Sequence, residues 1–181
     1  MKREPSGFVV DWAAAADARA IVDLVNEAYR TPGPQAWTSE AHLLGGQRTD
    51  AAMVESAIGV SGGGILLLRE PDGIVGCVHL EPAHTGTCHL GLFAVRPDRQ
   101  GAGRGGALIA HAEQIARHGG SGFAEIAVIA QRQDLIAWYE RRGYQQTGGQ
   151  RPFPYGEPRF GRPRRPDLVF CILRKVLADP S

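Results

Sequence analysis

The sequence has few lysines, few cysteines and almost no net charge. Lys2 and Lys175 are its only lysines, and 20 basic side chains face 19 acidic ones, for a formal charge of +1. Such a balance argues against a surface that coats nucleic acid. Cys77, Cys88 and Cys171 are an odd number without C-x-x-C spacing, so we expect no disulfide framework and no bound metal.

Long apolar segments are also missing from the 181 residues. Apolar runs such as Ile65–Leu68 are too short to cross a bilayer, so no membrane association is expected. Met1–Pro5 leads into no apolar segment of the kind found in secretory signals. The expected location is therefore the cytoplasm, and the length fits one domain over residues 1–181.

Helical and extended patterns alternate along the chain, with consecutive strands in its middle. Asp17 and Asp50 are placed to cap two helices near the N-terminus. Strands are predicted at 8–10, 65–68, 74–80, 87–95, 123–129, 144–147 and 168–173. A further helix is predicted at 134–142, and another between the glycine-rich turn and Gly119. Residues 74–95 form the clearest hairpin, and 148–166 are predicted to be a long loop. The fold class is mixed α/β.

A glycine-rich turn after Val95 carries the strongest functional signal. Gly101, Gly103, Gly105 and Gly106 precede a strong helix, and their lack of Cβ atoms leaves backbone N–H groups open. Together with a helix N-terminus, such groups form a site for a phosphate or diphosphate. Arg99 and Arg104 are expected to add positive charge at its rim. The alternative without a binding function is a flexible turn that tolerates glycine.

The same glycines also satisfy the G-x-G-x-x-G dinucleotide fingerprint. That fingerprint requires a parallel βαβ unit with an acidic residue at the end of the following strand. Here the preceding strand belongs to a hairpin, and Glu125 stands at the start of the next strand. A nucleotide-dependent oxidoreductase therefore fits less well, and a phosphate-loop NTPase is excluded because Gly-Lys-Ser/Thr is absent.

Two segments resemble the GNAT N-acetyltransferase superfamily. Gln100, Gly103 and Gly105 match its Q/R-x-x-G-x-G/A motif, and 137–144 (AWYERRGY) resembles its Y-E-x-x-G-F/Y segment at the expected separation. The resemblance covers about residues 7–175. It implies a mostly antiparallel central sheet flanked by helices, with two splayed central strands, and acetyl-CoA as acyl donor.

The resemblance also implies which residues hold acetyl-CoA. One strand would bond the pantetheine arm through its backbone, and the glycine turn would hold the diphosphate. Arg132 stands where many relatives carry an asparagine that contacts the pantetheine arm, so that contact is in doubt here. The implied cofactor-binding residues are Phe93, Ala94, Val95, Gln100, Gly101, Ala102, Gly103, Arg104, Gly105 and Gly106.

Catalytic roles follow from the same resemblance. Tyr139 matches the tyrosine that protonates the departing thiolate in many members, although it could also be a packing residue on its helix. His89 stands where some relatives carry a catalytic glutamate, and Glu81 and His79 lie on the partner strand. These three are candidate general bases, against the alternatives of ordinary strand residues and of no dedicated base.

Two regions are candidate walls of the acceptor site. Between the first two helices, Trp37 would line a pocket and Glu40 would attract an amine; simple loop packing is the alternative. In 148–166, Tyr155 and five arginines suggest recognition of an anionic group, or else a solvated or dimer-forming loop. A homodimer is therefore kept open.

The expected activity is acetyl transfer from acetyl-CoA to a primary amine of a small molecule or peptide, by direct attack and without a metal. The alternative on the same fold is a non-catalytic acyl-CoA-binding or regulatory module.

Overall fold

The fold is built on one twisted seven-stranded sheet. The computed structural model describes residues 7–32 and 37–177, so Met1–Pro5 and the last four residues lie outside the described part. The strand order is β1-β3-β4-β5-β6-β9-β7, and only the β5–β6 pair is parallel. The strands are β1 (Val9–Trp12), β3 (Gly64–Glu70), β4 (Gly73–Ala83), β5 (Thr87–Val95), β6 (Phe123–Ile129), β7 (Gln145–Pro152) and β9 (Val169–Val176).

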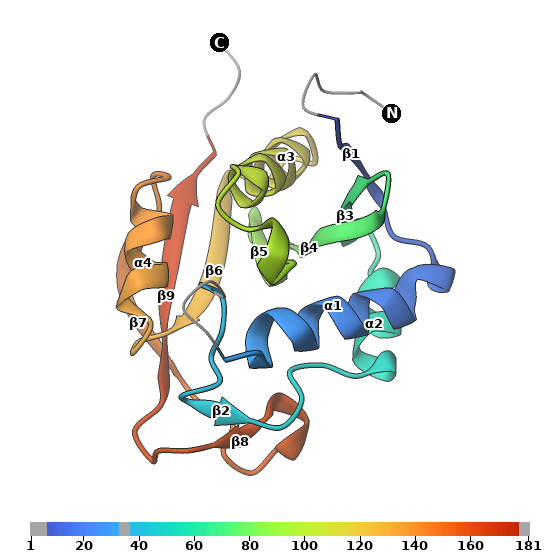
Figure 1. Ribbon diagram of the computed structural model, residues 1–181. Helices are drawn as coiled ribbons and strands as arrows, with labels where there is room; N and C mark the ends of the chain where they lie inside the picture. The colour runs from blue at the N-terminus through green and yellow to red at the C-terminus, as the bar shows by residue number, and fades with distance from the viewer. Residues whose placement is uncertain (1–6, 33–36, 178–181) are drawn as a thin grey trace.

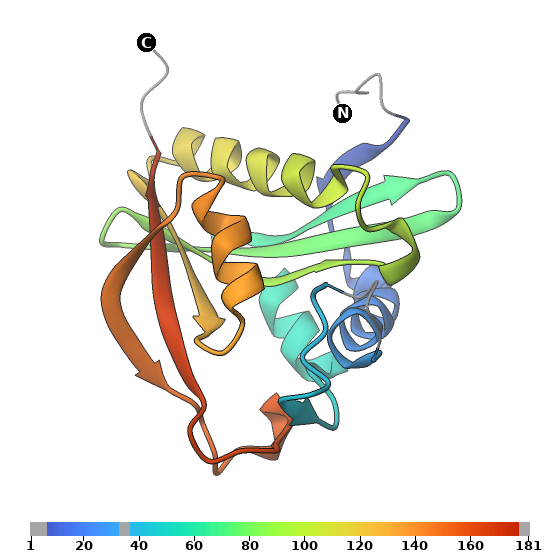
Figure 2. The ribbon, with the colours of Figure 1, turned by 60° about the vertical axis from the view of Figure 1, so that its left-hand side comes forward.

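Helices cover both faces of this sheet (Figures 1 and 2). On one face, α1 (Ala18–Arg30) and α2 (Ala51–Ile58) share a buried cluster with β3 and β4. On the other face, α3 (Arg104–His118) and α4 (Gln133–Glu140) share a larger cluster with β4, β5 and β6. The predicted mixed, mostly antiparallel α/β class is confirmed.

The two central strands separate part of the way along their length. β5 pairs with β6 only from Thr87 to Leu90, and the rest of β6 pairs with β9 alone. Just beyond the last pair, Leu92 has a φ of 44°, and the register between β4 and β5 shifts between Cys77 and His79. This bulge turns β5 away from β6 and leaves one backbone edge of β5 without a strand partner.

One of the two predicted helix caps is correct. The Asp50 carboxylate accepts a hydrogen bond from the Met53 N–H at 2.9 Å, as expected for an N-cap. Asp17 precedes α1 but makes no cap, because a 3₁₀ turn (Ala15–Asp17) comes directly before the helix. Its carboxylate instead bonds the Ala14 N–H and Arg69, which lowers the pKa of Asp17.

The segment 148–166 is more ordered than the loop predicted for it. Its first part belongs to β7, an exposed edge strand that pairs with β9 across a register shift between Gln146 and Gln150. A 3₁₀ turn follows (Pro158–Phe160), and β8 (Arg162–Pro163) then pairs with β2 (Leu44–Gly45). The β2–β8 pair holds this segment against the chain between α1 and α2.

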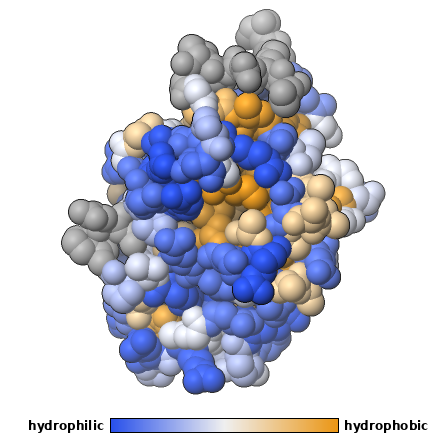
Figure 3. Space-filling model, turned by 45° about the vertical axis from the view of Figure 1, so that its right-hand side comes forward, coloured by the Kyte–Doolittle hydropathy of each residue, from blue (hydrophilic) through white to orange (hydrophobic). Residues whose placement is uncertain are grey.

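The molecular surface is mainly hydrophilic. On the face shown in Figure 3, hydrophilic side chains surround a hollow with a hydrophobic floor. Within residues 7–32 and 37–177, no helix has the length and apolar character needed to span a membrane.

Candidate functional site

The glycine turn presents a row of free backbone donors at the start of α3. None of the N–H groups from Gly101 to Gly106 donates to an acceptor within the described residues. Gly101 and Gly103 have φ values of 86° and 78°, and a Cβ at either position would meet no atom within 4 Å. Such donors at a helix N-terminus favour an anion.

Arg142 supplies the positive charge at this turn. It lines a groove of about 390 Å³ together with Gly101, Gly103, Gly105 and Gly106. Its guanidinium lies 3.5 Å from the centre of the Trp138 ring, and a Cβ on Gly106 would come within 3.3 Å of Nη2. Arg142 was not predicted as a site residue. The signal for it in the sequence is its four-residue spacing from Trp138 at the end of the predicted 134–142 helix.

Arg99 and Arg104, predicted to add positive charge at the rim, are both paired with carboxylates. Arg99 bonds Glu70 at 3.2 Å and also contacts Asp72, while Arg104 Nε bonds the other oxygen of Glu70. Carboxylates on β3 and on the β3–β4 turn therefore offset both charges. Nothing near the motif in the sequence indicated that Glu70 and Asp72 would pair with these arginines.

The free edge of β5 runs from this groove toward the centre of the sheet. The Arg96 N–H donates to Val75 on β4, so alternation along the strand directs the N–H groups of Val95 and Phe93 to the opposite, open side. The carbonyl of Phe93 accepts from the Tyr29 hydroxyl at 2.9 Å, and that of Val95 from Gln100 Nε2 at 2.8 Å. Because the carbonyls of Phe93 and Val95 are already bonded, the N–H groups of these two residues are the backbone groups left to bind a ligand.

Trp37 lies beside the glycine turn and lines the groove there rather than the cavity near Tyr139. Its ring stacks on Trp138 with centroids 5.2 Å apart, and a Cβ on Gly105 would lie 3.7 Å from it. Gln100 fixes this segment, because its side-chain oxygen accepts from the Trp37 N–H at 3.0 Å and its amide donates to Thr38 Oγ1 at 3.2 Å.

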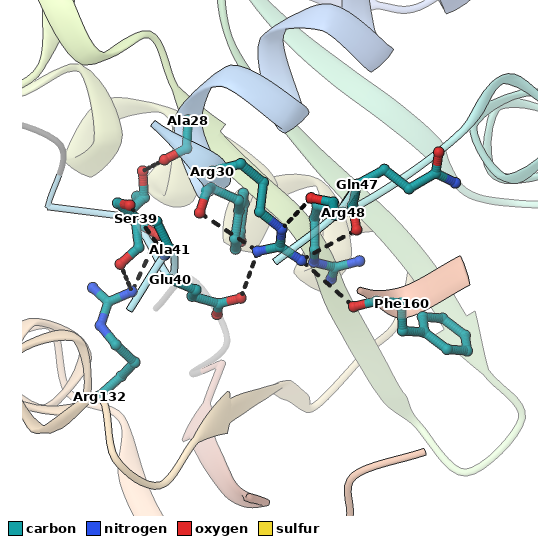
Figure 4. A network of polar contacts seen from close by, with 12 residues as sticks. Ala28, Arg30, Ser39, Glu40, Ala41, Gln47, Arg48, Arg132 and Phe160 are labelled. Atoms are coloured by element: carbon teal, nitrogen blue, oxygen red, sulfur yellow. Dashed lines mark hydrogen bonds and ion pairs between the residues drawn. The ribbon is translucent and has the colours of Figure 1, made fainter. Parts of the chain in front are cut away.

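Arg132 holds the same segment from the other side. Its side chain is 3% exposed, and it donates to the carbonyls of Trp37, Thr38 (3.1 Å) and Ser39 (3.0 Å). Figure 4 shows this guanidinium beside the 38–40 backbone. Asp134 completes its partners at 3.0 Å. Arg132 therefore fastens the chain after α1 to the start of α4.

A cavity of about 460 Å³ opens where β5 and β6 separate. Tyr139 of α4 lines it while being only 1% exposed, and burial raises the pKa of its phenol well above 10. The hydroxyl therefore stays protonated near neutral pH, and its O–H is available as a hydrogen-bond donor. Tyr139 also packs edge-on against Trp138 and Tyr144, so the packing role and the place in the cavity coexist.

All three candidate bases line the same cavity. His89 Nδ1 lies 3.4 Å from Glu125, and Glu81 is exposed. His79 Nε2 is buried and has no hydrogen-bond partner in the described part of the chain, and burial lowers the pKa of the ring. A neutral imidazole with an unpaired nitrogen can accept a proton.

Of the predicted acceptor contacts, Glu40 lines the cavity and Tyr155 does not. Glu40 is 6% exposed and pairs with Arg30 at 3.4 Å. Arg30 also donates to the carbonyls of Tyr29, Gly46, Gln47 and Phe160, as the centre of the network in Figure 4. The Tyr155 hydroxyl instead bonds the backbone of the following residues: it donates to the Arg165 carbonyl and accepts from the Leu168 N–H.

The fold agrees with comparisons to known proteins. The chain resembles the ribosomal-protein-S18-alanine N-acetyltransferase from Escherichia coli (17% identity, 96% of each chain, TM-score 0.70). It also resembles YncA from Salmonella typhimurium, solved with its cofactor acetyl-CoA (19%, 97% of each chain, 0.69), and Ard1 from Thermoplasma volcanium (12%, 96% and 99%, 0.72). No curated protein matches the sequence.

These structural similarities, at under 25% identity, establish the fold. A sequence match to the model of one family goes further, since it covers residues 18–144 and so includes the glycine turn, the free edge of β5 and Tyr139. The chain belongs to the acetyltransferase (GNAT) family.

Proposed function

We propose that the chain transfers an acetyl group from acetyl-CoA to a primary amine. One observation carries this proposal: a single free strand edge joins a diphosphate-sized groove to a cavity lined by a buried tyrosine. The unpaired N–H row and Arg142 suit the diphosphate, and the open edge of β5 suits the amide-containing pantetheine arm.

The residues of the site divide the reaction among them. Acetyl-CoA, when bound, supplies a thioester whose carbonyl carbon the amine attacks. Backbone N–H groups at the open edge of β5 donate to the carbonyl oxygen, where negative charge develops. As the new carbon–nitrogen bond forms and the carbon–sulfur bond breaks, the Tyr139 hydroxyl donates its proton to the sulfur, and the proton that the nitrogen loses on becoming an amide restores the hydroxyl. The proton lost by the substrate ammonium passes to His79, with Glu81 and His89 as the other candidates.

Transfer without a covalent acyl-enzyme suits the cysteines of this chain. Cys77, Cys88 and Cys171 are all buried and free. Burial raises the pKa of Cys77 to about 12 and that of Cys88 to about 11. Thiols held in this form are poor nucleophiles, because the thiolate is the reactive species.

A screen of primary amines with acetyl-CoA, followed by release of free thiol, tests the proposal. Acetyl-CoA binding without turnover of any amine would favour the non-catalytic module. Thermal stabilisation by NAD(P) but not by acetyl-CoA would favour the oxidoreductase and overturn the proposal.

Replacing Arg142 by glutamine is expected to weaken acetyl-CoA binding about ten-fold, because one charge-assisted contact to the diphosphate is lost. Titration calorimetry measures this change. The exposed neighbour Arg141 provides the matched control, Arg141→Gln. The KM of S-acetylpantetheine, a donor without the diphosphate, should be the same in wild type and Arg142→Gln; an equal loss for both donors would contradict the assignment.

Replacing His79 by glutamine is expected to lower kcat about 100-fold at pH 8, where the wild-type ring is neutral and accepts a proton. Because burial lowers the pKa of His79 below 6.5, the two rates should converge only as the pH falls below that value. The measurement is kcat against pH at saturating acetyl-CoA. His84→Gln, in the exposed β4–β5 turn, is the control. A constant ratio at all pH values would rule out His79 as the base.

A further inference from the structure

The charged side chains around the central cavity are not all neutralised. Among those that line it, Glu40 is paired with Arg30 and His89 lies beside Glu125. The side chains of Arg48, Glu81 and Arg151 take part in no hydrogen bond or ion pair within the described residues. The cavity thus offers two guanidiniums and one carboxylate to a ligand.

Arg48 is held in place without being neutralised. Its guanidinium lies over the Tyr29 ring, 5.2 Å from the centroid, and its backbone N–H donates to Asn26 Oδ1 at 2.6 Å. The Tyr29 hydroxyl in turn bonds the Phe93 carbonyl on the free edge of β5. The side chain of Arg48 is therefore positioned relative to the strand along which the donor would lie.

A second cation, Arg30, lies near the unpaired guanidinium of Arg48, and the repulsion between them is unfavourable. Burial lowers the pKa of Arg30, Glu40 acts against this shift, and the nearby Arg48 cation adds to it. Figure 4 shows the guanidiniums of Arg30 and Arg48 in the same region. Glu40 bonds Arg30, so it does not serve as a partner for Arg48. A half-buried guanidinium beside a second cation is stabilised most when an anion binds it.

Apolar side chains form much of the remaining cavity wall. They include Leu44, Ile129, Leu135, Phe153, Phe160 and Phe170. A ligand that satisfies the whole cavity therefore has an anionic group, an apolar body and the amine that reaches Tyr139.

We infer that the acceptor is a free amino acid with an apolar side chain, whose carboxylate binds Arg48. Arg151, exposed at the rim on β7, adds a second positive charge. The inference rests on the proposed function, since it names the acceptor of the same reaction. A peptide N-terminus lacks this carboxylate, so the inference separates free amino acids from peptides.

Three matched acceptors test the carboxylate: L-phenylalanine, L-phenylalaninamide and 2-phenylethylamine. We expect kcat/KM for the amino acid to exceed that of both others at least about ten-fold. Because an amine next to an amide has a low pKa, near 8, chemistry alone would favour the amide. A preference for the acid therefore reports the anion site, and equal or better use of the amide or the amine would overturn the inference.

The variant Arg48→Gln links this preference to one residue. It should lower the ratio of kcat/KM between amino acid and amine to near one, and Arg48→Lys should restore part of it. Arg19→Gln, on the exposed side of α1, is the matched control. An unchanged ratio in Arg48→Gln would refute the assignment even if the wild type prefers the acid.

Absence of acetyltransferase activity can be distinguished from absence of the anion site. If none of the amines is acetylated, calorimetry of the protein with bound CoA still tests the site. Tighter binding of L-phenylalanine than of 2-phenylethylamine, lost in Arg48→Gln, would support the anion site in a binding module. Equal binding of the two would overturn the inference.

Discussion

Tyr139→Phe is expected to lower kcat by at least about 100-fold, because the departing sulfur loses its only proton donor from α4. Phenylalanine keeps the ring that packs against Phe93, Trp138 and Tyr144, so the fold and the binding of acetyl-CoA should change little. Steady-state kcat and a calorimetric Kd separate these two effects.

The control for this experiment is a second buried tyrosine. Tyr144 packs edge-on against Tyr139, 5.3 Å between centroids, but does not line the cavity. Tyr144→Phe should therefore retain kcat. If Tyr139→Phe is as active as wild type, the phenol has only the packing role, and an unaided thiolate or another group must account for the departing sulfur.

Arg132→Met is expected to reduce the free energy of unfolding by about 3 kcal/mol. Methionine replaces the stem, but the carbonyls of residues 37–39 and the Asp134 carboxylate lose a partner that is almost fully buried. For a chain of this length the midpoint of thermal unfolding would fall by roughly 6–12 °C.

Denaturant titration and thermal scans measure this loss. Arg165→Gln is the matched control, since it removes an exposed pair with Asp167 and should change stability by less than about 0.5 kcal/mol. A loss of this small size for Arg132→Met would show that water satisfies the three carbonyls equally well.

The parts of the fold that the sequence predicted are those whose side chains are buried in a regular pattern. β3 and β5 are rich in buried apolar residues, and the glycines of the turn before α3 are needed for its backbone. β7 was missed beyond Thr147 because every one of its residues is exposed, so no apolar alternation marks it. The β2–β8 pair, two residues on each strand, is too short to leave any pattern.

Site residues that belong to one local sequence motif could be predicted. Site residues brought together from distant segments could not. The glycine turn and Tyr139 each belong to a local motif, and both lie where the groove and the cavity are found. Trp37 and Arg142 reach the groove only through tertiary packing on Trp138. The pairing of Arg99 and Arg104 with carboxylates about 30 residues earlier was hidden for the same reason.

The exposed strand β7 also bears on self-association. It is the last strand of the sheet, so its outer backbone groups would be open to a strand from another molecule. Gly148 with a φ of 79°, the register shift beside it and Pro152 interrupt that outer ladder. Irregularities of this kind deter strand addition, so this border of the sheet is protected against intermolecular β-pairing, and any homodimer is better sought on another surface.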